Sequence, residues 1–294
     1  MYFSIIIPCY NAQNTLTRTL DSIKAQQVFV KEIILIDDGS QDHTQAIAKH
    51  YIENHLSCTI DYHYQTNQGP GAARNKGAYL AKGQYTLFLD NDDALCEGAL
   101  ALFHQTFMEH PQAKLLIAGA NDINGQRKKS SIPNIYTNTL DILTAYWFGP
   151  LSIEGGATPI RTEVLKTTHY PENIKHGEDI VFFSRLLSQY PALILPIATL
   201  DSYRHPESLR NQQKSILSNG DKLTFILFDA HYLKPEYMIF RAQFHAQNLI
   251  TLAHAALLLK QKSQSRAFLA TAFQEYPKCF FKIRTLKMFL KTYL

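Results

Sequence analysis

The chain has 294 residues, of which 46% are apolar and 18% charged, so its composition excludes a disordered protein and allows one large domain or two. The net charge of +4 is unevenly divided, because residues 1–213 carry a net −4 and residues 214–294 a net +8. A basic C-terminal part suggests an anionic partner, either a membrane surface or a nucleic acid. The four cysteines form no C-x-x-C pair, so we expect reduced thiols and no zinc site.

Buried-strand patterns alternate with helical patterns in the N-terminal part of the chain. Strands are predicted at residues 3–9, 32–36, 59–64, 85–89 and 114–118. Helices are predicted at residues 15–26, 41–54, 97–109, and from the glycine-rich turn at 67–77 up to residue 82. Strands separated by single helices indicate parallel βαβ units. The sequence therefore predicts an α/β fold with a doubly wound, mostly parallel sheet flanked by helices.

The pattern changes after residue 121. Asn124, Gly125 and the basic run at 127–129 indicate a solvated hairpin or loop. Beyond it we expect a helix at 139–147, a short strand at 157–160, a helix at 178–189, and one or two strands at 192–203, divided by Pro196.

The C-terminal part has helical patterns throughout, at residues 214–233, 235–262, 264–276 and 278–294. The last of these carries basic but no acidic residues among aromatic and aliphatic side chains. Such a helix suits the surface of an anionic bilayer, and the alternatives are packing against the rest of the protein or forming a homo-oligomer. We therefore divide the chain into a domain at 1–210 and a basic all-helical region at 211–294.

No segment has the length and apolarity of a membrane span, because the longest apolar stretch, residues 249–259, is interrupted by Thr251 and His254. Met1 leads directly into a strand pattern, so we expect no signal peptide. These features predict a cytoplasmic protein, either soluble or peripheral on the cytoplasmic face of the inner membrane.

Three carboxylates follow directly after the strand that begins at Tyr85. Along an extended chain Asp90 and Asp92 lie on the same side, so both can converge on one cation. Hard cations such as Mg²⁺ and Mn²⁺ prefer oxygen ligands and keep coordination positions open for phosphates. The end of a buried strand is also where open α/β sheets bind ligands. The alternative is an acidic turn, including Asp93, that caps the next helix.

Polar or glycine-rich segments follow four of the predicted strands. They are Pro8–Asn11, Asp37–Ser40, Gly71–Asn75 and Asp90–Asp93. Because the carboxyl ends of parallel strands meet at one edge of a sheet, these segments predict a single crevice. Each segment alone is compatible with an ordinary turn.

These segments, together with Gly177–Asp179, resemble the motifs of the family 2 glycosyltransferases, which have the GT-A fold. The resemblance is carried, in the family's order and spacing, by residues 3–11, 34–42, 67–77, 85–93 and 177–179. It covers about residues 1–205 and leaves the helical tail outside. It implies a nucleotide-sugar donor, Mn²⁺ or Mg²⁺ as the metal, and one displacement that inverts the anomeric centre.

For the donor, the resemblance implies a pocket made by several strand ends. Asp38 would accept a hydrogen bond from a uracil-type imide, and Tyr10 would pack against that base. Arg74 would lie near the diphosphate. Asp92 would bind the metal directly, and Asp90 would contact ribose or reach the metal through water. The predicted donor site comprises Pro8, Tyr10, Asn11, Asp38, Arg74, Asp90, Asn91 and Asp92.

For the acceptor, the resemblance implies a catalytic base at Asp179, which takes the proton from the attacking hydroxyl. The expected acceptor contacts are Trp147, Gly156, His176 and Glu178. The alternatives are a core position for Trp147, and two acids favourably placed at a helix N-terminus for Glu178 and Asp179. His205 is a further candidate metal ligand, although it follows an arginine directly and so departs from the family's pattern; the alternative is a surface histidine.

The sequence thus predicts a metal-dependent, inverting glycosyltransferase. It would move a sugar from a nucleotide-sugar, expected to be a UDP-sugar, to a hydroxyl of a glycan or lipid-linked oligosaccharide, in the synthesis of lipopolysaccharide, capsule or a similar cell-surface polysaccharide. One alternative, a nucleotidyltransferase acting on a sugar phosphate, lacks its glycine-rich phosphate loop after the first strand. The other, a non-enzymatic protein that binds nucleic acid through its basic tail, leaves the acidic crevice unexplained. We expect no nucleic acid partner.

Overall fold

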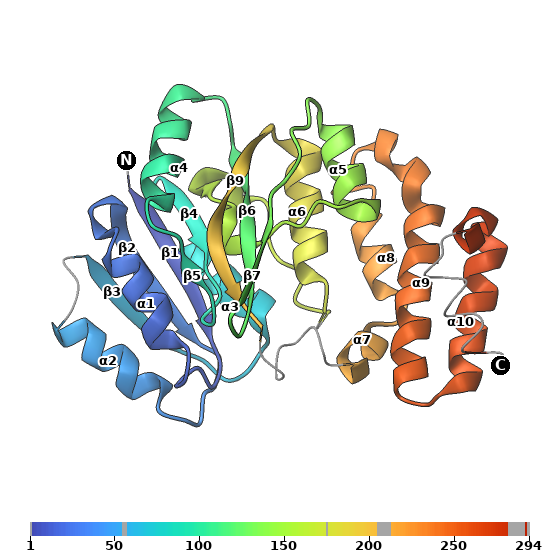
Figure 1. Ribbon diagram of the computed structural model, residues 1–294, viewed down its shortest axis with the longest axis horizontal. Coiled ribbons are helices and arrows are strands. Elements are labelled where there is room, and N and C mark those ends of the chain that lie inside the picture. Colours follow the sequence, from blue (N-terminus) through green and yellow to red (C-terminus); the bar gives the residue numbers. More distant parts are fainter. Residues whose placement is uncertain (1, 55–57, 175, 205–212, 282–291, 293–294) are drawn as a thin grey trace. The chain divides into compact units, whose positions relative to one another are not determined.

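The computed structural model describes residues 2–54, 58–174, 176–204, 213–281 and 292, and nine strands in these residues form one sheet (Figure 1). The strands are β1 (Phe3–Cys9), β2 (Val30–Asp37), β3 (Thr59–Tyr64), β4 (Tyr85–Phe88), β5 (Ala94–Leu95), β6 (Leu115–Asn124), β7 (Arg127–Ser131), β8 (Ile160–Arg161) and β9 (Ala192–Tyr203). The helices are α1 (Leu16–Lys24), α2 (Thr44–Asn54), α3 (Pro70–Leu80), α4 (Ala99–Glu109), α5 (Thr139–Phe148), α6 (Glu178–Gln189), α7 (Gln213–Asn219), α8 (Lys222–Leu227), α9 (Arg241–Leu258) and α10 (Lys262–Glu275).

The N-terminal half of the sheet is parallel, as the alternating pattern predicts. β1 pairs with β2 and β4, and β2 pairs with β3. All seven residues of β1 are buried, as expected for a central strand of a sheet that is covered on both faces. Ile5, Ile7 and Ile33 from these strands share one core cluster with Leu16 and Leu20 of α1.

The C-terminal half of the sheet is mixed. β6 and β9 are parallel, whereas β7 and β8 run antiparallel to β6, and β5 runs antiparallel to β9. The α/β class is therefore confirmed, with the mostly parallel order confined to the N-terminal half. The predicted hairpin is confirmed as well, because β6 meets β7 through Gly125, at a φ of +59°, and Gln126. A connection this short joins only antiparallel neighbours.

β9 is one strand that continues through Pro196 with a shifted register. Before the shift Ile194 lies opposite Ile117, and after it Tyr203 lies opposite Ile123. Nine steps along β9 thus correspond to six along β6, so β9 gains three residues. Pro196 has no N–H to donate to the ladder, which explains why the pairing is interrupted at this point.

Several predicted elements differ in the structure. The strand expected at 157–160 is reduced to β8, because a 3-10 helix covers Gly155–Ala157. The helix expected at 214–233 is interrupted after α7 by Gly220, whose φ of +53° is left-handed. The helix expected at 235–262 begins as the 3-10 helix Pro235–Phe240 and becomes α9. Of the last predicted helix, only the 3-10 turn Pro277–Phe281 and residue 292 lie within the described residues.

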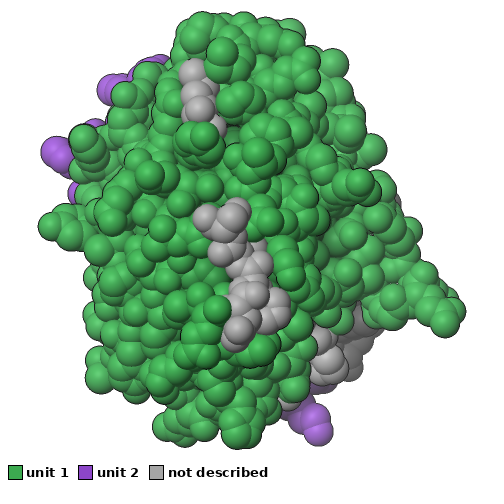
Figure 2. Space-filling model, turned by 90° about the vertical axis from the view of Figure 1, so that its left-hand side faces the viewer, with its two compact units in different colours: residues 1–172, 190–205 green, residues 173–189, 206–294 purple. Residues whose placement is uncertain are grey.

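The chain forms two compact units, which are coloured separately in Figure 2. The first, Met1–Glu172 and Tyr190–His205, contains the whole sheet. The second, Asn173–Gln189 and Pro206–Leu294, contains α6 as well as the C-terminal helices. Within it α6 packs against α8, and α9 packs against α10. No described helix is long and apolar enough to cross a membrane. The domain boundary after residue 210 stays a prediction.

Candidate metal and nucleotide-binding site

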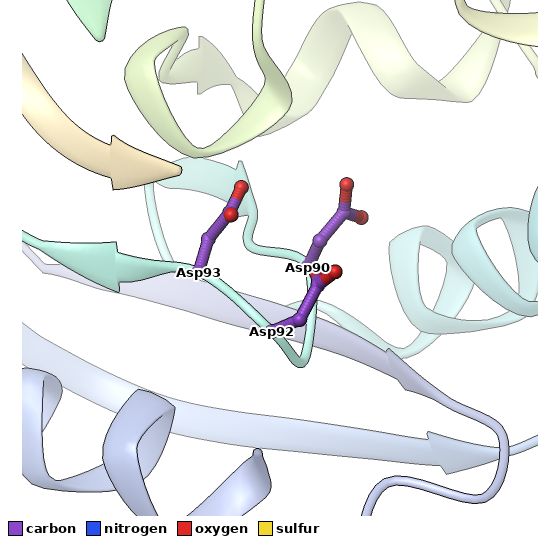
Figure 3. A group of neighbouring side chains, drawn as sticks. All are labelled: Asp90, Asp92 and Asp93. Carbon is purple, nitrogen blue, oxygen red and sulfur yellow. The ribbon is translucent and has the colours of Figure 1, made fainter. Parts of the chain in front are cut away.

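Asp90, Asp92 and Asp93 each bring a carboxylate oxygen to within 4.8 Å of the others (Figure 3). They lie in the loop between β4 and β5, hereafter the carboxylate loop. The loop is not extended, because the N–H of Asp93 donates to the carbonyl oxygen of Asp90 at 3.1 Å. Asp90 and Asp92 therefore converge as predicted, but through a turn, and this turn adds Asp93. Three carboxylates at such spacing suit a hard divalent cation.

Asp93 is the buried member of the three, at 6% exposure, while Asp90 and Asp92 are half-buried. Burial, followed by repulsion from Asp90, Asp92 and Glu154, raises the pKa of Asp93 to about 8. The N–H of Tyr203 donates to this carboxyl group at 3.2 Å and favours its charged form. Burial and the neighbouring carboxylates thus favour the neutral form of Asp93, and a bound cation would favour its ionisation.

Helix α1 holds the backbone of the carboxylate loop through two consecutive side chains. The hydroxyl of Thr19 bonds to the carbonyl oxygens of Asn91 and Asp93, at 2.8 and 2.7 Å. The guanidinium of Arg18 donates to the carbonyl oxygen of Asp92 at 2.6 Å. Three successive peptide groups of the loop are thus tied to one turn of α1.

Arg18 also joins the carboxylate loop to the end of β9. Its guanidinium lies 3.7 Å from the ring centroid of Tyr203, in a cation–π contact. Arg18 was not predicted as a site residue, because nothing in the pattern of an amphipathic helix distinguishes a lysine or arginine that reaches a loop from one that faces solvent.

Arg74 of α3 forms an ion pair with Asp90, with 2.7 Å between Nη2 and Oδ1, and its side chain is only 12% exposed. It also lies 5.2 Å from the ring centroid of Tyr170. The neighbouring Asn75 fixes Tyr170 in turn, since its amide donates to the Tyr170 carbonyl at 2.9 Å and to Glu172 at 2.8 Å, and accepts from the Tyr170 N–H at 2.8 Å. The predicted diphosphate ligand Arg74 is therefore positioned beside the carboxylate loop.

Asp38 is buried, at 4% exposure, and organises the loop that leads to α3. It accepts hydrogen bonds from the N–H groups of Gln68 and Gly69 and from the side chain of Gln65, each at 2.8 Å. Gly69 has a φ of +93°, which favours glycine, and precedes Pro70 at the start of the helix. Among the described residues, Oδ2 receives a hydrogen bond from Gly69 alone, so it has a lone pair for a further donor. The contact of Asp38 with a base stays a prediction.

The remaining predicted donor residues lie at the same edge of the sheet. The carbonyl oxygen of Pro8 accepts a hydrogen bond from the amide of Asn91 at 2.9 Å. Asn11 has a φ of +51°, and its N–H donates to Ser40 at 2.9 Å. Tyr10, between them, is 53% exposed. The ends of β1, β2 and β4 are thus joined by hydrogen bonds, which brings the predicted donor residues together.

Two of the predicted acceptor residues lie in the interior. Trp147 of α5 is 4% exposed, with its ring edge-on to Phe148. Gly156 is buried in the 3-10 turn Gly155–Ala157, where a Cβ would come 2.7 Å from Leu200 and 2.8 Å from Leu89. A larger residue at position 156 would therefore force these side chains apart. Contacts of Trp147 and Gly156 with an acceptor stay predictions.

The other predicted acceptor residues belong to the second unit. Glu178 and Asp179 form the first turn of α6, where the helix dipole favours negative charge. The carbonyl oxygen of His176 accepts a hydrogen bond from Asn219, and burial lowers the pKa of its imidazole. The carboxylate loop belongs to the first unit, so the roles of these residues stay predictions. His205 lies outside the described residues.

A network of charges at the ends of β6, β7 and β9 was not predicted from the sequence. Arg204 binds both carboxylate oxygens of Asp122, at 2.8 and 2.6 Å. Lys128 lies 3.1 Å from Asp201, which also accepts a hydrogen bond from Asn121 at 2.7 Å. The register of three strands brings these partners together. A single sequence does not reveal which residues of neighbouring strands lie opposite each other.

The family model for glycosyl transferase family 2 matches residues 4–167, which is more than half of the chain. This range includes β1 to β8, the carboxylate loop, Asp38 and Arg74. The chain therefore belongs to glycosyl transferase family 2, as its motifs indicate.

Curated relatives include a teichoic acid biosynthesis protein and two proteins that are named as glycosyltransferases. The chain is 30% identical over 199 residues to the minor teichoic acid biosynthesis protein GgaB of Bacillus subtilis, covering 64% of this chain and 21% of that protein. It is 30% identical over 190 residues to the poly(ribitol-phosphate) beta-N-acetylglucosaminyltransferase TarS of Staphylococcus aureus, covering 62% and 32%. An uncharacterized glycosyltransferase of Haemophilus influenzae is 30% identical over 248 residues, covering 82% and 92%. The chain thus spans less than half of the first two relatives.

Solved structures share the fold. S. aureus TarS 1-349 in complex with UDP-GlcNAc has a TM-score of 0.62 at 22% identity, covering 94% of this chain and 89% of that one. The mannosyltransferase PcManGT of Pyrobaculum calidifontis, in complex with GDP-Man and Mn²⁺, has a TM-score of 0.59 at 15% identity, covering 98% and 85%. These likenesses confirm the expected GT-A-type α/β fold.

Proposed function

We propose that the protein transfers a sugar from a UDP-sugar to a hydroxyl group of a cell-surface glycan or lipid-linked acceptor, with inversion of the anomeric centre. The observation that carries this proposal is the group of Asp90, Asp92 and Asp93, whose carboxylate oxygens lie within 4.8 Å of one another in a chain of glycosyl transferase family 2. A nucleotide-sugar leaves behind a diphosphate, and a carboxylate-bound cation is the usual partner of such a group.

The side chains around the carboxylate loop support a nucleotide diphosphate as the donor's leaving group. Arg74 brings a guanidinium to Asp90, and a guanidinium can bind phosphate oxygens in pairs. Tyr10 presents an exposed ring for a base, and Oδ2 of Asp38 retains a lone pair for an imide N–H. The structure of TarS with UDP-GlcNAc favours uridine, whereas that of PcManGT with GDP-Man makes guanosine the alternative to exclude.

The residues of the loop fit a divalent metal ion. They offer oxygen ligands alone, and the carboxyl group of Asp93 is poised to lose a proton when a cation binds. Asp92 would hold Mn²⁺ or Mg²⁺ directly, and Asp90 directly or through water. The ion would supply charge neutralisation for the departing diphosphate.

For the acceptor, the proposal assigns Asp179 as the base that removes the proton of the attacking hydroxyl group. The names of GgaB and TarS support a cell-wall or cell-surface polymer as the acceptor, with lipopolysaccharide and capsule as further members of that class. The net charge of +8 in residues 214–294 supports a peripheral position of this region on an anionic membrane at the cytoplasmic face. The alternative is that its helices form a homo-oligomer.

Thermal unfolding with UDP, GDP and CDP, each with and without Mn²⁺, tests the proposal on wild type, Asp92→Ala and the control Asp61→Ala. Asp61 is a half-buried aspartate of β3, outside the carboxylate loop. A ligand at 100 times its dissociation constant adds about 2.7 kcal/mol to the free energy of unfolding. We expect UDP to raise the melting temperature only with Mn²⁺, in wild type and Asp61→Ala but not in Asp92→Ala.

Two results would contradict this assignment. If UDP still raised the melting temperature of Asp92→Ala, the nucleotide would bind elsewhere. If no nucleotide raised the melting temperature of wild type, the proposed donor site would be wrong. A shift with GDP alone keeps the site but replaces the uridine donor by a guanosine donor.

A further inference from the structure

β7 is the outer strand of the β6–β7 hairpin (Figure 1). It carries exposed basic side chains. All five residues of β7 are exposed, and Arg127, Lys128 and Lys129 begin the strand. Lys128 forms an ion pair with Asp201, with 3.1 Å between Nζ and Oδ1. Because side chains alternate along a strand, Arg127 and Lys129 lie on the other face. Within the described residues, neither of these two has an ion-pair partner.

The register of the sheet gathers more charge on that face. Lys129 lies directly opposite Asp122 of β6, and opposite residues of an antiparallel pair share a face. Arg204, just after β9, binds both oxygens of Asp122 from the other side. Asp122 is therefore flanked by two cations, and Arg127 adds a third. We name these four residues the hairpin cluster, and its net charge is +2.

The hairpin cluster lies close to the carboxylate loop. Tyr203, the residue before Arg204, donates its N–H to Asp93. Strands of a sheet are about 4.8 Å apart, so β7 lies only about 10 Å from β9, across β6.

We propose that the hairpin cluster binds an anionic group of the acceptor through Arg127, Lys129 and Arg204, and so holds a negatively charged acceptor chain beside the carboxylate loop. The inference rests on the proposed function, because it assigns a charge and a binding surface to the acceptor of that reaction. Phosphate and carboxylate groups both match a guanidinium fork, and an extended basic edge suits a chain that repeats its charge.

Basic residues on an outer strand also prevent sheets from joining edge to edge, and this role has different consequences. If it were the only role, charge reversal would keep the edge charged and leave anion binding intact. If the hairpin cluster binds an acceptor, charge reversal would weaken the binding of anionic chains in a protein that stays monodisperse.

The test uses the full chain and three soluble probes: short-chain inorganic polyphosphate, oligogalacturonate, and neutral maltoheptaose. The variant Arg127→Glu/Lys129→Glu is compared with Lys31→Glu/Lys49→Glu, which makes the same change of charge at two exposed lysines of the same unit. Titration calorimetry gives the dissociation constants at low and physiological salt. We expect wild type to bind polyphosphate, oligogalacturonate or both in a salt-sensitive way, and not maltoheptaose.

The hairpin variant should bind the anionic probe about tenfold more weakly, and the control variant should match wild type. Asp122→Asn should bind more tightly, because it removes the only acid of the hairpin cluster. An equal loss in both double variants, or unchanged binding in the hairpin variant, would overturn the inference. The Mn²⁺-dependent UDP shift, measured on the same samples, reports separately on the proposed function.

Discussion

The guanidinium of Arg18 donates to the carbonyl oxygen of Asp92 at 2.6 Å, so a side chain of α1 fixes the peptide group of the candidate metal ligand. The same guanidinium stacks on Tyr203, whose N–H bonds to Asp93. Arg18 thus links the backbone of Asp92 to Tyr203, the residue that bonds to the carboxyl group of Asp93, without being a metal ligand itself.

We expect Arg18→Met to weaken Mn²⁺ binding about tenfold, because partners behind a metal ligand orient it and typically contribute that much affinity. The dissociation constant for Mn²⁺ in the presence of UDP checks this. Arg161→Met is a matched control, since Arg161 also donates to two backbone carbonyls and stacks near Tyr85, outside the carboxylate loop. Equal affinity in Arg18→Met and wild type would refute the role.

The raised pKa of Asp93 makes the stability of the metal-free protein depend on pH. The unfolded carboxyl group ionises near pH 4, whereas the folded one holds its proton up to about pH 8. Between these values the folded state binds more protons, so the contribution of Asp93 to stability falls as the pH rises and levels off above pH 8. The free energy of unfolding of Asp93→Asn, taken relative to that of wild type, should therefore be higher at about pH 8.5 than at about pH 5.

Urea unfolding in EDTA at both pH values measures this difference. A stability difference between Asp93→Asn and wild type that is the same at both values would show that Asp93 ionises normally in the folded state.

Asn75→Ala should lower the free energy of unfolding by about 1–3 kcal/mol, because it leaves the backbone N–H and carbonyl groups of buried Tyr170 without their partner. Glu172→Ala removes only the exposed third contact of the same amide and should cost less than about 0.5 kcal/mol. Urea titrations of the two variants give both values, and similar losses would contradict the importance of the Tyr170 contacts.

Asp179→Asn should reduce turnover by about 10²–10⁴-fold while leaving the UDP-induced thermal shift unchanged, because the proposed base acts on the acceptor hydroxyl and not on the nucleotide. Asp229→Asn, at an exposed aspartate of the same unit, should keep full activity. Loss of UDP binding in Asp179→Asn would point to a structural role at the start of α6 instead.

The fold of the N-terminal part could be predicted because its signals are local. Isoleucine-rich runs mark β1 and β2, and the polar residues directly after each strand pattern identify Asp38 and Asp90. Arg74 was found through its place in a glycine-rich helix start that matches the family's motif. The structure joins these separate segments by direct contacts, such as the ion pair of Arg74 with Asp90.

What the sequence did not reveal depends on geometry between segments. Asp93 joins the other two carboxylates only because the loop turns after Asp90. Arg204 meets Asp122 only through the pairing of β6 with β9. The antiparallel pairs in the second half of the sheet likewise depend on which strands become neighbours. The residue pattern of a strand does not reveal which strand lies next to it.

The three residues that β9 gains between Ile194 and Leu200 decide which side chain meets Arg18. Side chains alternate along a strand, so a change of one residue in this segment exchanges the two faces of everything after it. A one-residue deletion there would bring Arg204 to the place of Tyr203 and set two guanidinium groups against each other. A one-residue insertion would bring Ser202, which has no ring to stack on. A segment without ligand-like residues thus governs, through its length alone, how the carboxylate loop is held.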